Sequence, residues 1–255
     1  MVRDGNVRNI QISGCDIEAN MPGDSTETST ANVLLDVSSS PGNRKKSIAE
    51  VSITGCTIQH SANYSGEETK TLAPGGSNIR IVGKEIYPVD SVTISGNVLS
   101  DTTTHIDLTH VMEVTITANN FFAPKPANLE VTDSRRVVVS GNTFNPRQFS
   151  RPGTIRFTNT HDSILSGSTL HRFETAEGAV ILDGCTGFTL NALNFSDCGS
   201  GILMSNCKGV TISACRIART TEGGFDLSAK DKNQDLLLSG NVFSGKVEVP
   251  TSVTE

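Results

Sequence analysis

The side chains of this chain best suited to chemistry are Arg80, His105, Asp107, Glu130 and Arg156. Asp107 and Glu130 offer two carboxylates that could serve as acid, base or nucleophile, and His105 offers a proton acceptor. The arginines offer positive charge for an anionic substrate or intermediate. These residues are widely separated in the sequence, so they can act together only if the fold brings successive segments into register.

That register follows from a short phrase that occurs nine times along the chain. Each copy has two mostly apolar positions that alternate with others, then a polar residue, Gly or Ala, a small or polar residue, and an apolar residue two places later. The copies are residues 10–17, 51–58, 92–99, 114–121, 137–144, 163–170, 188–195, 210–217 and 236–243. Only one first position, Ser163, is not apolar. Alternation with a period of two marks strands, and the Ser-Gly-Asn step between two such stretches is turn chemistry.

The spacing of the phrase indicates the architecture. Successive Gly/Ala positions are 41, 41, 22, 23, 26, 25, 22 and 26 residues apart. This period is too short for a propeller blade and too β-patterned for helical repeats. A further alternating stretch lies between one phrase and the next, as in Ile106-Asp-Leu108 and Leu129-Glu-Val131. The pattern therefore predicts one coil of a parallel β-helix per repeat, with three strands in each coil.

The pattern Gly-Ile-x-Leu-x-x-Ser/Asn-x-x-Val-Thr-Ile-Ser-Gly-Asn-x-Phe resembles the repeat of the pectate-lyase-like superfamily over nearly the whole chain. The resemblance implies an all-β, right-handed parallel β-helix solenoid of about nine coils, and it favours an extracellular or cell-surface location. It leaves the function open, because that superfamily includes lyases, hydrolases, epimerases, phage tailspikes and adhesins. The Asn-Thr-Asp, Asp-Asp and Gly-His-Gly set of polygalacturonases and the Arg-x-Pro-x-x-Arg string of pectate lyases are missing, so no catalytic residue is carried over by motif.

Length and composition limit the remaining possibilities. One repeat runs through all 255 residues, which predicts a single domain over 1–255. The formal net charge of −6 argues against a nucleic-acid partner. No segment has the roughly 18 apolar residues of a membrane span, and none resembles a signal peptide, so the sequence itself assigns no location. We expect a segment of a longer protein, with an oligomer partner or a missing domain over its uncapped ends.

The outward positions of the strand between phrases place the reactive residues together. Coils stack about 4.8 Å apart, and residues between two inward positions face solvent. The predicted outward column is Leu34, Arg80, Asp107, Glu130, Arg156, Ile181, Leu203, Asp226 and Glu248. His105, two residues before Asp107, falls in the neighbouring column, which we also expect to face outward. Asp107 and Glu130 should then titrate as a coupled pair with one pKa raised, unless the flanking arginines neutralise both.

Long insertions flank this strand face. They cover residues 18–30, 38–49, 59–77 and 83–90 and carry the only two tyrosines, Tyr64 and Tyr87. Long loops on a rigid scaffold commonly hold binding sites. We therefore assign substrate binding to Tyr64, Tyr87, Arg80 and Arg156, with packing of the loops onto the scaffold as the alternative reading of the tyrosines.

The other candidate groups give weaker signals. Six cysteines are too few for a disulfide scaffold, and the equivalent positions of Cys15 and Cys56, and of Cys185 and Cys207, favour stacked buried thiols. No metal site or cofactor is predicted, although Ca²⁺ on the two carboxylates could replace the arginines; two carboxylates are too few to define such a site. The remaining histidines share no spacing, and the catalytic-looking string Asn159-Thr-His-Asp162 occurs once, at a turn.

The sequence thus predicts a carbohydrate-active β-helix protein that acts on or binds an extended polysaccharide, with Asp107, Glu130 and His105 as catalytic residues. A carboxylate separation near 5 Å would fit a retaining hydrolase, whereas an inverting enzyme needs about 6.5–9.5 Å. In a lyase, Arg80 or Arg156 would neutralise a uronate carboxylate, and His105 or a neighbouring basic group would take the C5 proton. The alternative is a non-catalytic structural or adhesive β-helix, such as a surface protein or phage fibre segment. Its alternating charges would only stabilise the sheet, by about 0.2–1 kcal/mol per pair.

Overall fold

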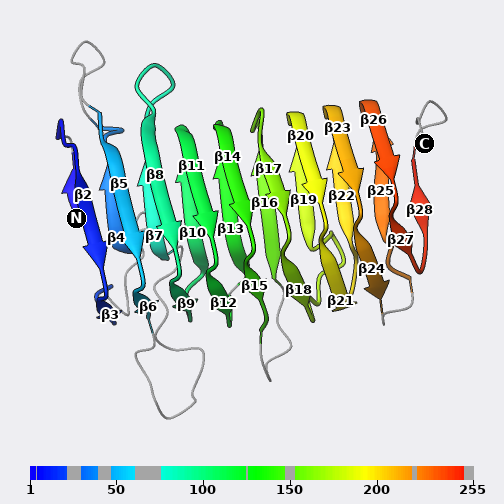
Figure 1. Ribbon diagram of the computed structural model, residues 1–255, viewed down its shortest axis with the longest axis horizontal. Helices are drawn as coiled ribbons and strands as arrows, with labels where there is room; N and C mark the ends of the chain where they lie inside the picture. Colours follow the sequence, from blue (N-terminus) through cyan, green and yellow to red (C-terminus); the bar gives the residue numbers. More distant parts are fainter. Residues whose placement is uncertain are drawn as a thin grey trace.

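The structure is a computed structural model that describes residues 1–3, 5–21, 30–39, 47–60, 76–124, 126–146, 153–219 and 223–249. Within these residues the chain forms strands and turns but no helix, and three parallel sheets enclose one core (Figure 1). The sheets have ten, nine and nine strands. We call them sheet 1, sheet 2 and sheet 3 in the order in which the chain enters them.

The three sheets take one strand from each coil in turn. Sheet 1 consists of β1 (Val2–Arg3), β4 (Ala31–Asp36), β7 (Ser77–Val82), β10 (Thr104–Thr109), β13 (Ala127–Thr132), β16 (Thr154–Thr158), β19 (Val180–Asp183), β22 (Ile202–Ser205), β25 (Leu227–Asp231) and β28 (Val247–Glu248). Sheet 2 consists of β2 (Ile10–Ser13), β5 (Ala49–Thr54), β8 (Val89–Ser95), β11 (Val111–Thr117), β14 (Arg135–Ser140), β17 (Ile164–Ser166), β20 (Thr186–Asn191), β23 (Lys208–Ser213) and β26 (Gln234–Ser239). Sheet 3 consists of β3 (Asp16–Glu18), β6 (Thr57–Gln59), β9 (Val98–Ser100), β12 (Asn120–Phe122), β15 (Thr143–Phe144), β18 (Thr169–His171), β21 (Asn194–Cys198), β24 (Arg216–Arg219) and β27 (Val242–Phe243).

Each repeated phrase supplies one strand to sheet 2 and one to sheet 3, and the stretch between phrases supplies the strand of sheet 1. The predicted all-β parallel β-helix with three strands per coil is confirmed. No helix of the described chain has the length and apolar character that crossing a bilayer requires.

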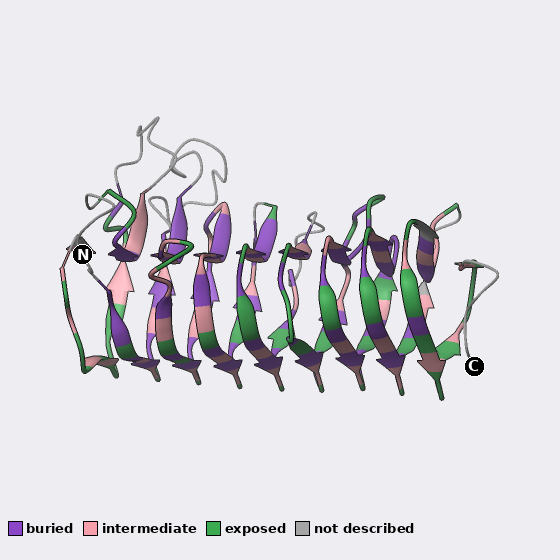
Figure 2. Ribbon diagram, turned by 90° about the horizontal axis from the view of Figure 1, so that it is seen from above, coloured by how far each residue is buried: buried purple, intermediate pink, exposed green. Residues whose placement is uncertain are grey.

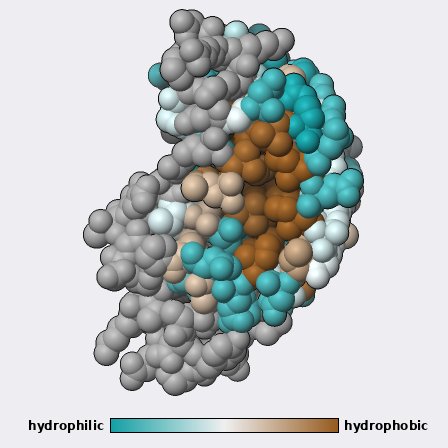
Figure 3. All heavy atoms as spheres, turned by 90° about the vertical axis from the view of Figure 1, so that its left-hand side faces the viewer, coloured by the Kyte–Doolittle hydropathy of each residue, from teal (hydrophilic) through white to brown (hydrophobic). Residues whose placement is uncertain are grey.

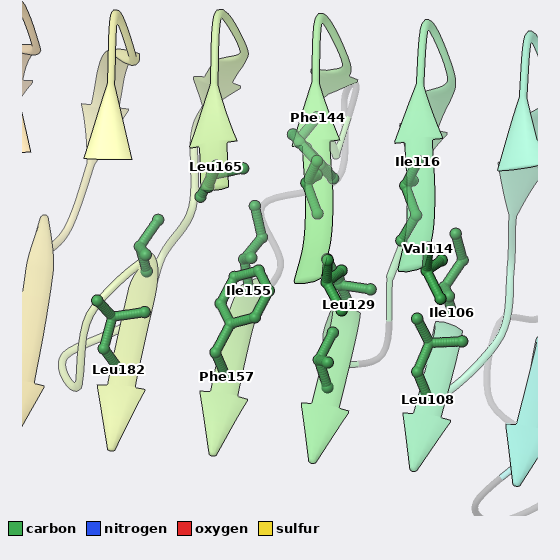
Figure 4. Close-up of a cluster of buried hydrophobic side chains, with 14 of the residues drawn as sticks. Ile106, Leu108, Val114, Ile116, Leu129, Phe144, Ile155, Phe157, Leu165 and Leu182 are labelled. Carbon is green, nitrogen blue, oxygen red and sulfur yellow. The ribbon is translucent and has the colours of Figure 1, made fainter. Parts of the chain in front are cut away.

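The core consists of apolar columns that run along the solenoid axis. One predicted column is paired rung by rung through Ile12, Ile53, Ile94, Ile116, Val139, Leu165, Leu190, Ile212 and Leu238. All its members are buried except the two at the ends, which are partly exposed. Figure 4 shows part of this core, where side chains from neighbouring coils point toward one another. Buried and exposed residues alternate along the strands, as Figure 2 shows.

The turn between sheets 2 and 3 explains the Gly/Ala mark of the phrase. At this position the backbone φ is positive in every coil, for example 64° at Gly96 and 55° at Ala118. Only Gly adopts this conformation without steric cost, and Ala pays for it. The next residue points inward, and here asparagines form a ladder in which Asn97 Nδ2 donates to Asn119 Oδ1 (3.0 Å) and Asn119 Nδ2 to Asn142 Oδ1 (3.1 Å).

The surface of the N-terminal end of the solenoid is partly apolar. Figure 3 shows aliphatic side chains at the surface of the N-terminal end, where Val2, Ile10, Ile12 and Ile17 pack on the core but are only partly buried. That an oligomer partner or a missing domain covers this end stays a prediction.

The assignment of Asp226 to the outward column of sheet 1 is wrong. The strand starts later than its alternating pattern suggests, so Ser228 pairs with Leu203 and Asp226 is fully buried.

Candidate functional site

The reactive residues of sheet 1 lie on four adjacent strands, as predicted. Arg80 of β7 pairs in register with Asp107 of β10, Asp107 with Glu130 of β13, and Glu130 with Arg156 of β16. We call these four residues the charged ladder. In-register strands set neighbouring rungs about 4.8 Å apart, so the two carboxylates face the same side at close range.

The ion pairs of the charged ladder are uneven. Arg80 Nη1 donates to Asp107 Oδ2 at 2.6 Å, and both side chains are largely covered, with 23% and 17% of their surface exposed. Arg156 Nη2 instead donates to Glu177 Oε2 at 3.1 Å. No described residue forms a hydrogen bond or ion pair with the Glu130 carboxylate. The ladder therefore contains one paired carboxylate beside one unpaired carboxylate.

Burial dominates the electrostatics of both acids. It raises the pKa of Asp107, although the charge and hydrogen bond of Arg80 oppose the shift. It also raises the pKa of Glu130, where the negative charge of Asp107 adds to the effect and Arg156 and Arg80 oppose it. A carboxyl with a raised pKa keeps its proton closer to neutral pH, which is the property of a general acid.

His105 does not join the charged ladder, and its predicted outward position is wrong. It is fully buried, 6.0 Å from the ring of Phe121 between centroids, and its Nδ1 lies 3.0 Å from Thr102 Oγ1 and 3.3 Å from Asn78 Nδ2. Burial lowers the pKa of His105 to about 3, so the imidazole is neutral.

The physical reason is the corner between sheets 3 and 1. The first three residues of β10 are all buried, and alternation begins only at Asp107. Asn78 and Asn128, at the equivalent places of β7 and β13, are buried as well. A residue at this corner points inward although its parity along the strand suggests the outer face, so a strict period-two pattern could not have shown it.

The two tyrosines predicted to bind substrate both lie in insertions between strands. Tyr64 lies outside the described residues. Tyr87 is part of the excursion 83–88 at the corner between sheets 1 and 2, where it exchanges two backbone hydrogen bonds with Lys84 at 3.0 and 3.1 Å. Its role in substrate binding stays a prediction.

A pocket of about 500 Å³ lies at that same corner. Its lining consists of Lys84, Glu85, Pro88, His110, Val111, Asp133, Ser134, Arg135, Asn159 and His161. None of these belongs to the charged ladder. One signal for this pocket was present in the sequence, because the string Asn159-Thr-His-Asp162 contributes Asn159 and His161 to the lining. The residues from other coils could be joined to it only through the register of the strands.

The cysteines follow the expectation of stacked thiols. All six are free, and all but Cys15 are buried. Cys185 and Cys207 are adjacent in neighbouring coils. The shared thiol hydrogen bond and burial raise the pKa of Cys185, which keeps that thiol protonated. The five buried thiols are part of the apolar core.

Comparison with known proteins places the chain in a family. The family model described as "Periplasmic copper-binding protein (NosD)" matches residues 49–254. No curated protein matches the chain.

Several solved structures share the fold at low sequence identity. The tailspike protein of Acinetobacter baumannii phage AM24 is 14% identical with a TM-score of 0.55, over 93% of this chain and 44% of that one. A DFA-IIIase mutant from Arthrobacter chlorophenolicus A6 is 14% identical with a TM-score of 0.53, over 96% of this chain and 74% of that one.

Proposed function

The chain belongs to the NosD family of parallel β-helix proteins, and we propose that it acts on an extended polysaccharide lying across the outer face of sheet 1. The fold is shared with a phage tailspike and a DFA-IIIase, which makes carbohydrate the first substrate class to test. The observation that carries the proposal is Glu130: a half-buried carboxyl with a raised pKa, unpaired among the described residues, one rung from a second carboxylate.

The geometry fits hydrolysis with two carboxylates. Glu130 is the general acid, because burial and the neighbouring Asp107 favour its protonated form. Asp107, held in place by Arg80, is the second carboxylate. A rung spacing of about 4.8 Å agrees with the roughly 5 Å separation of retaining glycosidases, in which the second carboxylate attacks the sugar. A lyase is less well supported, since His105, the named candidate to take the C5 proton, is fully buried at the corner.

The name of the family raises copper as a ligand, and the described residues do not fit a copper site. Soft thiolate and thioether groups and imidazoles are the side chains that bind copper in proteins. All five histidines, six cysteines and four methionines of the sequence lie among the described residues. These residues contain no group of three or more His, Cys, Asp or Glu that could hold a metal ion.

The individual ligands show why. Five cysteines are buried in the core, and Met112 Sδ already accepts hydrogen bonds from Arg135 Nε at 3.2 Å and Arg136 Nη2 at 2.6 Å. Among the described residues, His110 and His161 line the same pocket. Two imidazoles without a third soft ligand do not make a copper centre, so the proposed reaction involves no copper.

A non-catalytic role is the second candidate, and one observation favours it. Arg80 is paired with Asp107 and Arg156 with Glu177, so two of the three carboxylates near the ladder serve ion pairs that join different parts of the sheet face. Such pairs would stabilise a structural or adhesive solenoid without any reaction. Glu130 is the residue that distinguishes the two functions, because it takes part in neither pair.

The test is a panel of neutral and uronate-containing polysaccharides, followed by reducing ends for hydrolysis and by ultraviolet absorbance of unsaturated sugars for a lyase. We expect hydrolysis, and Glu130→Gln should slow it by about 100-fold or more because general acid catalysis is worth roughly 10²–10⁴. Glu177→Gln is the matched control and should retain activity. If the wild-type chain cleaves nothing in the panel, the non-catalytic solenoid is the better account.

A further inference from the structure

The pocket between sheets 1 and 2 has a wall that the backbone holds in place. The excursion 83–88, visible as the loop above β8 in Figure 1, leaves and rejoins the coil beside His110. Gly83 N donates to Thr109 O at 2.8 Å, and Val89 N donates to His110 O at 3.2 Å. A Cβ on Gly83 would lie 2.1 Å from His110 O, so only glycine permits this approach. Because both ends of the excursion are bonded to the next coil, the pocket is preformed.

The floor of the pocket is built from two columns of the solenoid. His110, Asp133 and Asn159 follow the last residues of β10, β13 and β16, and Asn159 Nδ2 donates to Asp133 Oδ1 at 3.1 Å. Arg135 and His161 are bridge partners in the adjacent column. The floor thus extends over two coil steps of about 4.8 Å each, or about 10 Å. The volume of about 500 Å³ falls within the range of small-ligand sites, about 300–1,000 Å³.

The chemistry of the lining favours a neutral, hydroxyl-rich ligand. Two cations, Lys84 and Arg135, are balanced by two anions, Glu85 and Asp133. A carboxylate or phosphate ligand would meet as much repulsion as attraction, so charge gives it no advantage. Imidazole, amide and carboxylate groups together supply both donors and acceptors to hydroxyls. The side chains of His110 and His161 have no hydrogen-bond partner among the described residues, which leaves their nitrogens available.

The pocket also lies on the path that a polysaccharide at the charged ladder would follow. Asp133 is three residues beyond Glu130 and directly follows the last residue of β13, a distance of at most about 10 Å at roughly 3.3 Å per residue. His110 has the same relation to Asp107 on β10. A chain that crosses sheet 1 at the carboxylate pair and continues along these strands reaches the pocket one or two sugar units later.

From the lining, its charge balance and its position, we infer that this pocket is a binding subsite for a neutral sugar unit of the polysaccharide. The inference rests on the proposed function for the polymer but assigns different residues to a different task. Asn159 and His161 bind sugar hydroxyls, while the charged ladder performs the reaction. The preference for a neutral unit over a uronate applies to this pocket and not to the charged ladder.

The experiment measures binding at the pocket directly by following the imidazole C–H signals of the five histidines in NMR spectra. His110→Ala and His161→Ala assign the two pocket signals. Titration with neutral hexoses and their disaccharides should shift the signals of His110 and His161. The signal of His171, bound to Ser196 Oγ in sheet 3, is the internal control and should not move. Glucuronate and galacturonate should bind at least about tenfold more weakly than their neutral counterparts. The inference is overturned if no neutral sugar shifts the pocket signals, or if the uronates bind more tightly.

Two variants separate this subsite from the reaction. Asn159→Ala should weaken sugar binding at the pocket about tenfold or more, and Glu130→Gln should leave it unchanged. Polysaccharide cleavage with a KM that Asn159→Ala does not alter would contradict the subsite while the proposed function stands. Sugar binding at the pocket in a chain that cleaves nothing would support the subsite and remove the proposed reaction.

Discussion

The outer face of sheet 1 has two halves that share a backbone but differ in chemistry. From β7 to β16 the outward residues form the charged ladder, and from β19 to β25 they are Ile181, Leu203 and Ser228. The pairing register runs through both halves, and the inward neighbours are apolar in both. The core therefore fixes the backbone without fixing the outward residues, and those positions are free to carry a site.

The second half is also more closely covered. Ile181 points outward by register but is only 2% exposed. A Cβ on Gly178 would lie 3.2 Å from the Leu203 side chain, so the segment before β19 folds against this face. One half of the face is thus stabilised by apolar contact, whereas the other has the half-buried carboxyl of Glu130 beside the Arg80–Asp107 ion pair.

The largest expected effect comes from the core that both halves share. Phe144 is fully buried and stacks on Phe121 with ring centroids 4.5 Å apart, and Phe195 lies further along the same column under the second half. Phe144→Ala and Phe195→Ala should each reduce the free energy of unfolding by about 3–5 kcal/mol, because fixed coils cannot close the cavity. Chemical denaturation measures both, and Thr143→Ala at an exposed position is the control. A loss below about 1 kcal/mol for either would show that its ring is not enclosed.

The Arg80–Asp107 ion pair should contribute less to the free energy of unfolding than either phenylalanine ring. A double-mutant cycle with Arg80→Ala and Asp107→Asn should give a coupling free energy of about 1–3 kcal/mol, because both side chains are largely covered. The comparison pair is Lys246 with Glu248. Glu248 lies in the same outward column as Asp107, but the Lys246 side chain is 63% exposed. Its coupling should be below about 0.5 kcal/mol. Equal couplings for the two pairs would contradict the contrast between them.

Replacing alanine by glycine at the Gly/Ala position of the repeated phrase should change stability by a smaller amount. The change should be the same in both halves, because every coil has this turn. Ala118 and Ala214 occupy the Gly/Ala mark with φ of 55° and 52°. Replacement by Gly relieves about 1–2 kcal/mol of steric cost and adds about 0.5–1 kcal/mol of unfolded-state entropy. Each variant should therefore raise the free energy of unfolding by about 0.5–1 kcal/mol. Ala127→Gly, within strand β13, should lower it instead, and a loss at the two turns would show that they are not strained.

The last prediction concerns the direction in which Glu130 makes stability depend on pH. The pKa of Glu130 is raised in the folded chain, so protonation favours the fold, and this stabilisation is lost as pH rises from the ordinary glutamate value of 4.5 through the raised value. Glu130→Gln should therefore increase stability above that range and reduce the dependence of stability on pH. Denaturation midpoints from pH 4 to pH 8 provide the measurement, with the exposed Glu174→Gln as control. A destabilised Glu130→Gln at neutral pH would instead mean that the charge of Glu130 stabilises the ladder.

The sequence predicted the parts of the molecule that depend on period and parity. Equivalent positions of a repeat must stack, so Ile94 and Ile116 were expected in one buried column and Asp107 and Glu130 on adjacent outward rungs, as observed. Parity fails where a strand meets a corner or starts late. His105 follows the corner between sheets 3 and 1 into the interior, and Asp226 precedes its strand.

The repeat pattern was therefore enough to predict the all-β coil, its three strands and the residues of the charged ladder, because each follows from local alternation that recurs along the chain. The ion pairs of the charged ladder could be read only from the folded chain. Arg156 pairs with Glu177, which precedes β19, and Glu130 has no ion-pair partner among the described residues. The corner pocket likewise exists only in the folded chain, because Lys84, His110 and Asn159 come from three different coils. Pairing and concavity depend on distances between side chains of separate coils, and a one-dimensional period contains no such distances.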